Sequence, residues 1–99
     1  MDKILSLEEL QNDSNSIGMY AFFDLKSHRL DTPFFCQNDM FAGRHYKMAV
    51  DQPNSMLNKF KEDFEVHRLG FINLINEEYT PKWEVIIEGK LQSVVEPLD

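Results

Sequence analysis

A short segment that is apolar at almost every position constrains the fold of this chain most strongly. In residues 18–24, one face of an extended chain would carry Tyr20 and Phe22, and the other would carry Met19, Ala21 and Phe23. Successive side chains of a β-strand point to opposite faces, so this pattern makes both faces apolar. A strand of this kind is stable only when it is covered on both sides. Residues 18–24 are therefore predicted to form a central strand.

A helix is predicted for residues 38–51. Asn38 or Asp39 should begin it, because either side chain can accept the free amides of a first helical turn. Pro33 favours an extended segment at residues 34–36 before the helix, and Pro53 ends it by disfavouring helical geometry in the preceding residue. One side of this helix is apolar, and close packing is expected at Gly43, because a glycine inside a helix costs about 1 kcal/mol.

Two later segments also have the two-residue period of strands. Residues 64–75 give a strand with one mixed face, and Trp83, Val85 and Ile87 alternate with charged residues in a third strand. Ser6 and Glu9 have the spacing of a capping box, which predicts a short helix near residues 6–11. The fold class is therefore α+β: a small, largely antiparallel sheet of three to four strands packed by one main helix, with a short N-terminal helical arm.

The chain of 99 residues is expected to contain one folded domain, because 42% of its residues are apolar and 27% are charged. We predict an N-terminal arm at 1–18, a single domain at 19–90 and an acidic tail at 91–99. No apolar run is long enough for a bilayer, and no secretory signal is evident. The one cysteine, Cys36, fits a reducing compartment. These features indicate a cytoplasmic protein without membrane contact.

Charge is distributed unevenly along the chain. The net charge is −7, yet residues 19–76 contain seven acids and seven bases, so the excess acid lies at the two ends. Nonspecific affinity for nucleic acids comes from lysine and arginine that release counterions from phosphates. The neutral middle of the chain could therefore carry a basic face. The acidic ends could keep the protein soluble, mask a binding surface or bind a basic partner.

Short motifs recur in a fixed order through the middle of the chain. They are Tyr20-Ala21-Phe22-Phe23-Asp24, Thr32-Pro33-Phe34-Phe35, Asn38-Asp39, Arg44, Pro53-Asn54-Ser55-Met56-Leu57, Glu62-Asp63-Phe64 and Leu69-Gly70. In this order they resemble the small nonstructural protein of gokushovirus-type microviruses, which are phages with single-stranded DNA genomes. The resemblance covers roughly residues 19–71. It implies a viral accessory factor that acts in the host bacterial cytoplasm, in genome replication or packaging.

The same region contains the candidate binding residues. Single-stranded nucleic acids are bound by cations that follow the backbone and by exposed rings on which bases stack. The alternative is that the aromatic residues lie in the core and the cations are solvated. The candidate cations are Lys26, Arg29, Arg44, Lys47, Lys59, Lys61 and Arg68, and the candidate stacking rings are Phe35, Tyr46 and Phe60.

Patterns typical of enzymes are missing from the sequence. It has no glycine-rich phosphate loop, no nucleophile elbow and no paired histidine spacing. The three histidines and Cys36 lie in different predicted elements, and Glu62-Asp63 fits a turn or cap better than a magnesium site. We therefore predict no catalytic residues, no metal site and no cofactor.

Two functions remain open. The protein could be a small single-stranded DNA binder, or it could be an adaptor that binds the viral replication initiator or a host replication factor without touching DNA. Arg44 should contact a ligand phosphate or form a bidentate pair with a carboxylate such as Asp63. A homodimer is also expected, formed through a sheet edge or through the strand that contains Trp83.

Overall fold

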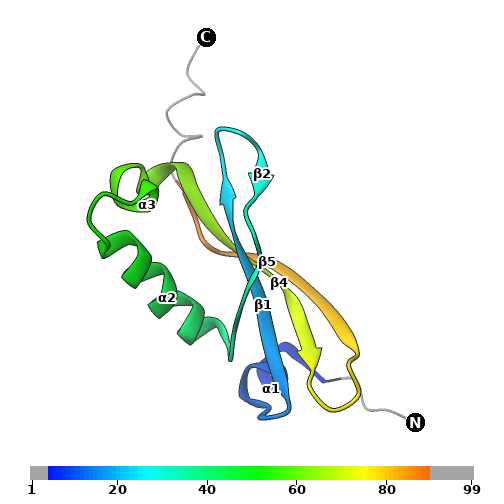
Figure 1. The fold of residues 1–99 in the computed structure, drawn as a ribbon. Helices are drawn as coiled ribbons and strands as arrows, with labels where there is room; N and C mark the ends of the chain where they lie inside the picture. Colours follow the sequence, from blue (N-terminus) through cyan, green and yellow to red (C-terminus); the bar gives the residue numbers. More distant parts are fainter. Residues whose placement is uncertain (1–4, 90–99) are drawn as a thin grey trace.

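The computed structural model describes residues 5–89, and the predicted acidic tail at 91–99 lies outside this range. The chain forms an open sheet with one long helix beside it (Figure 1). The elements are α1 (Leu7–Asn12), β1 (Ser16–Asp24), β2 (Arg29–Leu30), β3 (Phe34–Cys36), α2 (Asp39–Asp51), α3 (Met56–Lys59), the 3-10 turn η1 (Lys61–Asp63), β4 (Phe64–Asn73) and β5 (Tyr79–Ile87).

All strand pairings in the sheet are antiparallel, and the strand order is β2-β1-β4-β5, with β3 also pairing with β1. The predicted α+β class is confirmed. The sheet has five strands where three to four were expected. The added strand is β2, which forms because the Asp24 carboxylate accepts the amides of Lys26 and Ser27 and turns the chain back.

The prediction that residues 18–24 are a central strand is confirmed. β1 lies between β4 on one side and β2 and β3 on the other, and Tyr20, Ala21 and Phe22 are buried. The strand begins two residues before Gly18, at Ser16, so part of the expected arm belongs to the sheet. Residues 74 and 75, expected at the end of β4, instead lie in the exposed turn before β5.

The helix α2 covers one face of the sheet. Ala42 is fully buried against Tyr20, Phe22 and Val66, and the half-buried Tyr46 packs against this cluster. The predicted apolar side of the helix is therefore confirmed. The expected close packing at Gly43 is wrong, because a Cβ built there would meet no atom of another element within 4 Å.

The close approach occurs at Gly70 in β4. A Cβ at this position would lie 2.4 Å from the carbonyl oxygen of Thr80 in β5. Backbone atoms cannot move aside as the end of a side chain can, so only glycine fits here without shifting β5. This explains the glycine at a point where the pairing of β4 with both of its neighbours shifts register.

The N-terminal arm is attached to the start of α2. The predicted capping box is present, since Ser6 and Glu9 exchange side chain to backbone hydrogen bonds at the start of α1. At the other end of α1, Gln11 accepts two hydrogen bonds. Its side-chain oxygen accepts one from the backbone amide of Asp39, and its backbone carbonyl accepts one from the side-chain amide of Asn38. The arm therefore packs against the main helix through specific hydrogen bonds.

Asn38 is the residue that begins α2. Its side-chain oxygen accepts the amide of Phe41 at 3.3 Å. We expect Asn38→Ala to lower the free energy of unfolding by about 1 kcal/mol, since both this bond and the one to Gln11 are lost. Denaturant unfolding measures the change, with the exposed neighbour Gln37→Ala as a control that leaves stability unaltered. Equal stability of the two variants would show that Asn38 does not cap the helix.

Candidate functional site

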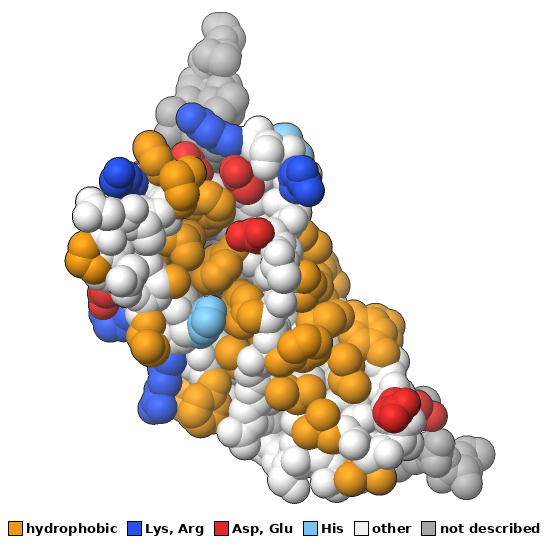
Figure 2. Space-filling model, in the orientation of Figure 1, with side chains coloured by type: hydrophobic (Ala, Val, Ile, Leu, Met, Phe, Trp, Pro, Cys, Tyr) orange, Lys and Arg blue, Asp and Glu red, His pale blue; other side chains and the backbone are white. Residues whose placement is uncertain are grey.

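Several of the predicted cations meet at one end of the molecule. The turn between β1 and β2 is attached to η1 by a hydrogen bond of 2.8 Å from the Leu25 amide to the Asp63 carbonyl. This bond brings together two stretches of sequence that carry exposed lysine and arginine side chains and one exposed ring. Figure 2 shows Lys and Arg side chains at this end of the molecule with Asp and Glu side chains among them. We call this surface the cationic end, and its members are Lys26, Arg29, Lys59, Phe60 and Lys61.

Phe60 is exposed because of the way the chain leaves α3. Ser55 caps this short helix by accepting the amide of Asn58, and the Phe60 amide closes it by donating to the Met56 carbonyl. The chain then changes to η1 at Phe60, whose φ of −131° and ψ of 41° are not helical. Phe60 remains 47% exposed between two exposed lysines in the sequence, and an exposed ring with cations nearby is the combination on which a base can stack.

Acidic residues are interleaved with these cations. Asp24 uses its side chain to form the β1–β2 turn, while Asp31 and Glu62 are exposed nearby in sequence. The acids reduce the positive potential at a distance, so the surface would act on phosphates by direct contact more than by long-range attraction.

The outer side of α2 carries the two remaining exposed cations. Lys47 lies 3.9 Å from Asp51 in an exposed ion pair, and the Arg44 guanidinium lies 5.3 Å from the centre of the Phe41 ring. The predicted pairing of Arg44 with Asp63 is wrong, since no ion pair among residues 5–89 includes Arg44. The possibility that Arg44 contacts a ligand phosphate stays a prediction.

Arg68 is the arginine that pairs with carboxylates. Its side chain is 3% exposed, and its two terminal nitrogens contact Asp39 and Glu84, each at 2.5 Å. Its Nε donates to the carbonyl of Lys82, and the Tyr20 hydroxyl donates to the other oxygen of Asp39. Burial raises the pKa of Tyr20, and the hydrogen bond to Asp39 raises it further. We call these residues the Arg68 network.

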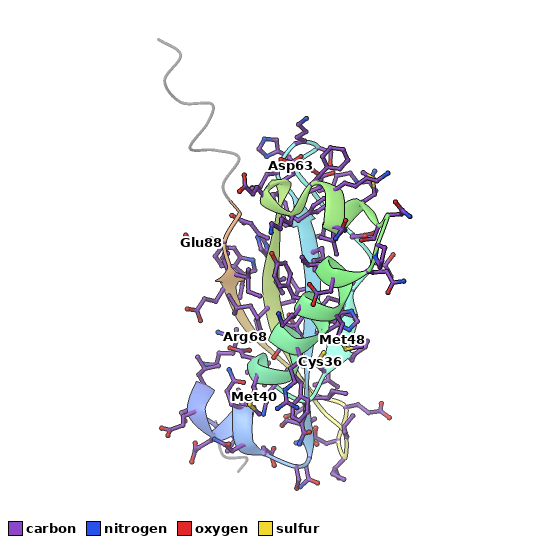
Figure 3. The ribbon with its side chains drawn as sticks, turned by 90° about the vertical axis from the view of Figure 1, so that its left-hand side faces the viewer. Cys36, Met40, Met48, Asp63, Arg68 and Glu88 are labelled. Atoms are coloured by element: carbon purple, nitrogen blue, oxygen red, sulfur yellow. The ribbon has the colours of Figure 1, made fainter. Side chains whose placement is uncertain are left out.

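This network joins α2 to three strands of the sheet, and Arg68 lies beside the first turn of α2 (Figure 3). All three nitrogens of its guanidinium group are engaged within the protein. Arg68 was among the predicted binding cations, and the structure removes it from that set, because a phosphate could reach it only by displacing its carboxylates.

The other two candidate rings do not present an open face at the cationic end. Tyr46 is half-buried and packs against the core cluster. Phe35 is 51% exposed, but β3 pairs with residues 18–20 of β1, whereas the turn and β2 are at the opposite end of that strand. Of the three predicted stacking rings, Phe60 is the exposed one beside the cations, while the half-buried Tyr46 lines a pocket together with Lys47 and Lys61.

A groove that the sequence did not predict adjoins the cationic end. It has a volume of about 670 Å³ and lies between the β1–β2 hairpin on one side and α2 and α3 on the other. Phe22, Leu57 and Phe64 line it, and the exposed Met48 and Met56 lie at its rim. Figure 2 shows apolar side chains gathered along this face, and Figure 3 shows Met48 on the flank of α2.

The groove could not be predicted from the sequence, because its residues come from four separate segments: the β1–β2 hairpin, α2, the start of α3 and β4. Methionine side chains are flexible and polarisable, and they recur at surfaces that bind partners of varied shape. The only signal in the sequence is the presence of Met48 and Met56 near the end of α2 and the start of α3. By itself, that spacing also fits a buried helical face.

The histidines and the cysteine are engaged in packing. The His67 ring stacks on Phe23 at 4.8 Å, and its two nitrogens contact Glu65 and Trp83. The His45 ring stacks on Phe34 at 4.3 Å, and burial raises the pKa of Cys36. Within residues 5–89, no three His, Cys, Asp or Glu side chains are grouped so that they could hold a metal ion.

Comparison with known proteins identifies a family. The model of the family described as Phage ORF5 protein matches residues 17–81, which is more than half of the chain and includes the central strand, α2 and the cationic end. No curated protein and no solved structure matches the chain. None of the helices within residues 5–89 is long and apolar enough to cross a membrane.

Proposed function

Because the chain belongs to the Phage ORF5 protein family, we propose that it is the nonstructural accessory protein of a gokushovirus-type microvirus. In this proposal it acts in the host cytoplasm, in replication or packaging of the single-stranded DNA genome, and it does so without catalysis. The ordered motifs between Tyr20 and Gly70 support the assignment, since they lie within the segment that the family model matches.

The molecular activity that we propose is binding of single-stranded DNA by the cationic end. One observation carries this proposal: the Leu25–Asp63 hydrogen bond joins the turn that carries Lys26 and Arg29 to the segment in which Phe60 lies between two lysines. The cations would contact successive phosphates, and one base would stack on the Phe60 ring. Such a stack is worth about 1–3 kcal/mol for any base, so binding would depend little on sequence.

An NMR titration with a deoxythymidine oligonucleotide tests where DNA binds. We expect backbone amide shifts in residues 25–30 and 59–63, because these two stretches form the cationic end. Residues 72–78, in the turn at the far end of β4, supply an internal control that should not shift. Shifts confined to that turn or to β3 would contradict the proposed location.

The groove supports a second candidate function. The groove has apolar residues in its lining and at its rim, and polar residues of the β1–β2 hairpin also line it, so it is suited to an amphipathic partner helix. In this alternative the protein is an adaptor for the viral replication initiator or a host replication factor. The titration separates the two functions, because an adaptor without DNA contact would show no shifts with the oligonucleotide at low salt.

A further inference from the structure

The strand β5 leaves one long edge of the sheet open. It is the last strand in the order β2-β1-β4-β5, and within residues 5–89 no strand pairs with its outer side. Two large apolar side chains on it are exposed, Trp83 at 62% and Tyr79 at 45%. An open edge presents unpaired backbone groups that can pair with a strand of another chain.

The charges of β5 are complementary to those of a second, antiparallel copy of the same strand. The strand has nine residues, from Tyr79 to Ile87, so Trp83 is its midpoint. Against β4, the strand carries one extra residue near Lys82 and Trp83 and another at Ile86, which bend it locally. When two copies pair antiparallel about a two-fold axis at Trp83, all nine positions overlap in sequence, and Lys82 of each copy is placed opposite Glu84 of the other. Opposite charges at directly opposed positions stabilise an antiparallel pair.

We propose that two copies of this chain associate through β5 in this register, which extends the sheet across both molecules. A shift of the axis by one residue would place Glu84 opposite Glu84, or Lys82 opposite Lys82, and like charges at such positions are unfavourable. The charges therefore favour the register centred on Trp83 over the registers centred on Lys82 or Glu84.

The other positions fit this register as well. Tyr79 lies opposite Ile87 and Thr80 opposite Ile86, which are pairs of aromatic and β-branched residues that suit a sheet. Arg68 contacts only Oε1 of Glu84, and the Glu84 side chain is 59% exposed, so Oε2 can accept Lys82 of the second copy. Pro81 cannot donate, which removes at most one hydrogen bond from each strand.

Sedimentation equilibrium at micromolar concentrations measures dimerisation of the wild type and of variants in which one charge is reversed. The wild-type chain should dimerise, and Lys82→Glu should raise the dissociation constant of the dimer about tenfold, because two like-charge pairs replace two opposite pairs. Lys59→Glu makes the same change of charge at the cationic end, so it serves as the matched control and should dimerise like the wild type.

Mixing two variants tests the register itself. Lys82→Glu and Glu84→Lys should each be mostly monomeric alone and should form a heterodimer when mixed, because each then meets an opposite charge. A monomeric wild type, or a Lys82→Glu dimer as stable as that of Lys59→Glu, would overturn the proposal. This second comparison decides the matter even if Glu84→Lys, which loses the Arg68 contact, fails to fold.

Discussion

Replacing Asp39 by alanine should lower the free energy of unfolding by about 3 kcal/mol, because the substitution leaves the buried Arg68 guanidinium without one of its two carboxylates. The Tyr20 hydroxyl loses its acceptor in the same variant. Denaturant unfolding of the purified chain, with circular dichroism as the readout, measures the loss.

Asp51 provides a matched control in the same helix. Its ion pair with Lys47 is exposed and 3.9 Å long, so Asp51→Ala should change stability by no more than about 0.5 kcal/mol. An Asp39→Ala variant as stable as Asp51→Ala would show that the Arg68 network does not stabilise the fold.

A double-mutant cycle separates the ion pair from other effects at the start of the helix. Asp39→Ala combined with Arg68→Ala should cost less than the sum of the two single substitutions, because each alone breaks the same contact. Additive losses would instead indicate that Asp39 acts through the helix terminus alone.

The regular elements of this fold could be predicted because their signals are local. The alternation in β1, the capping oxygen of Asn38 and the breaker Pro53 each act over a few residues. The two residues of β2 gave no such signal. Their pairing depends on the Asp24 turn, which places Leu30 opposite Phe23.

The roles of the arginines could not be predicted, because they depend on tertiary contacts. Arg68 meets partners 29 and 16 residues away in sequence, and only the packing of α2 against β4 and β5 brings these groups together. Arg44 was expected to contact a ligand phosphate or to form a carboxylate pair, and it lies on the outer side of α2 beside Phe41. The carboxylate pair that was one of the two alternatives for Arg44 is instead formed by Arg68, which had been predicted only as a binding cation.

A second substitution with a large expected effect tests DNA affinity. Lys59→Gln combined with Lys61→Gln removes two cations from either side of Phe60, and it should weaken binding of an oligodeoxythymidine roughly fiftyfold near 50 mM salt. The estimate follows from the counterions released at each phosphate contact. Both residues are exposed, so the variant should keep the stability of the wild type.

Arg44→Gln combined with Lys47→Gln is the control for this variant. It lowers the net charge from −7 by the same two units but changes the outer side of α2. Lys47 lines a pocket with Lys61 but is paired with Asp51, and Arg44 lies beside Phe41, so affinity should stay within about threefold of the wild type if binding is confined to the cationic end. Equal losses in the two double variants would show that overall charge, and not the cationic end, determines binding.

The measurement that tests the central claim most directly is the salt dependence of oligodeoxythymidine affinity for the wild type and these two double variants. With four phosphate contacts at the cationic end, the logarithm of the wild-type association constant should fall with the logarithm of salt concentration with a slope of about −3. The slope should fall to about −1.5 for Lys59→Gln with Lys61→Gln and stay near −3 for the control. No binding of the wild type at low salt, or one slope shared by all three proteins, would contradict the proposal that the cationic end binds single-stranded DNA.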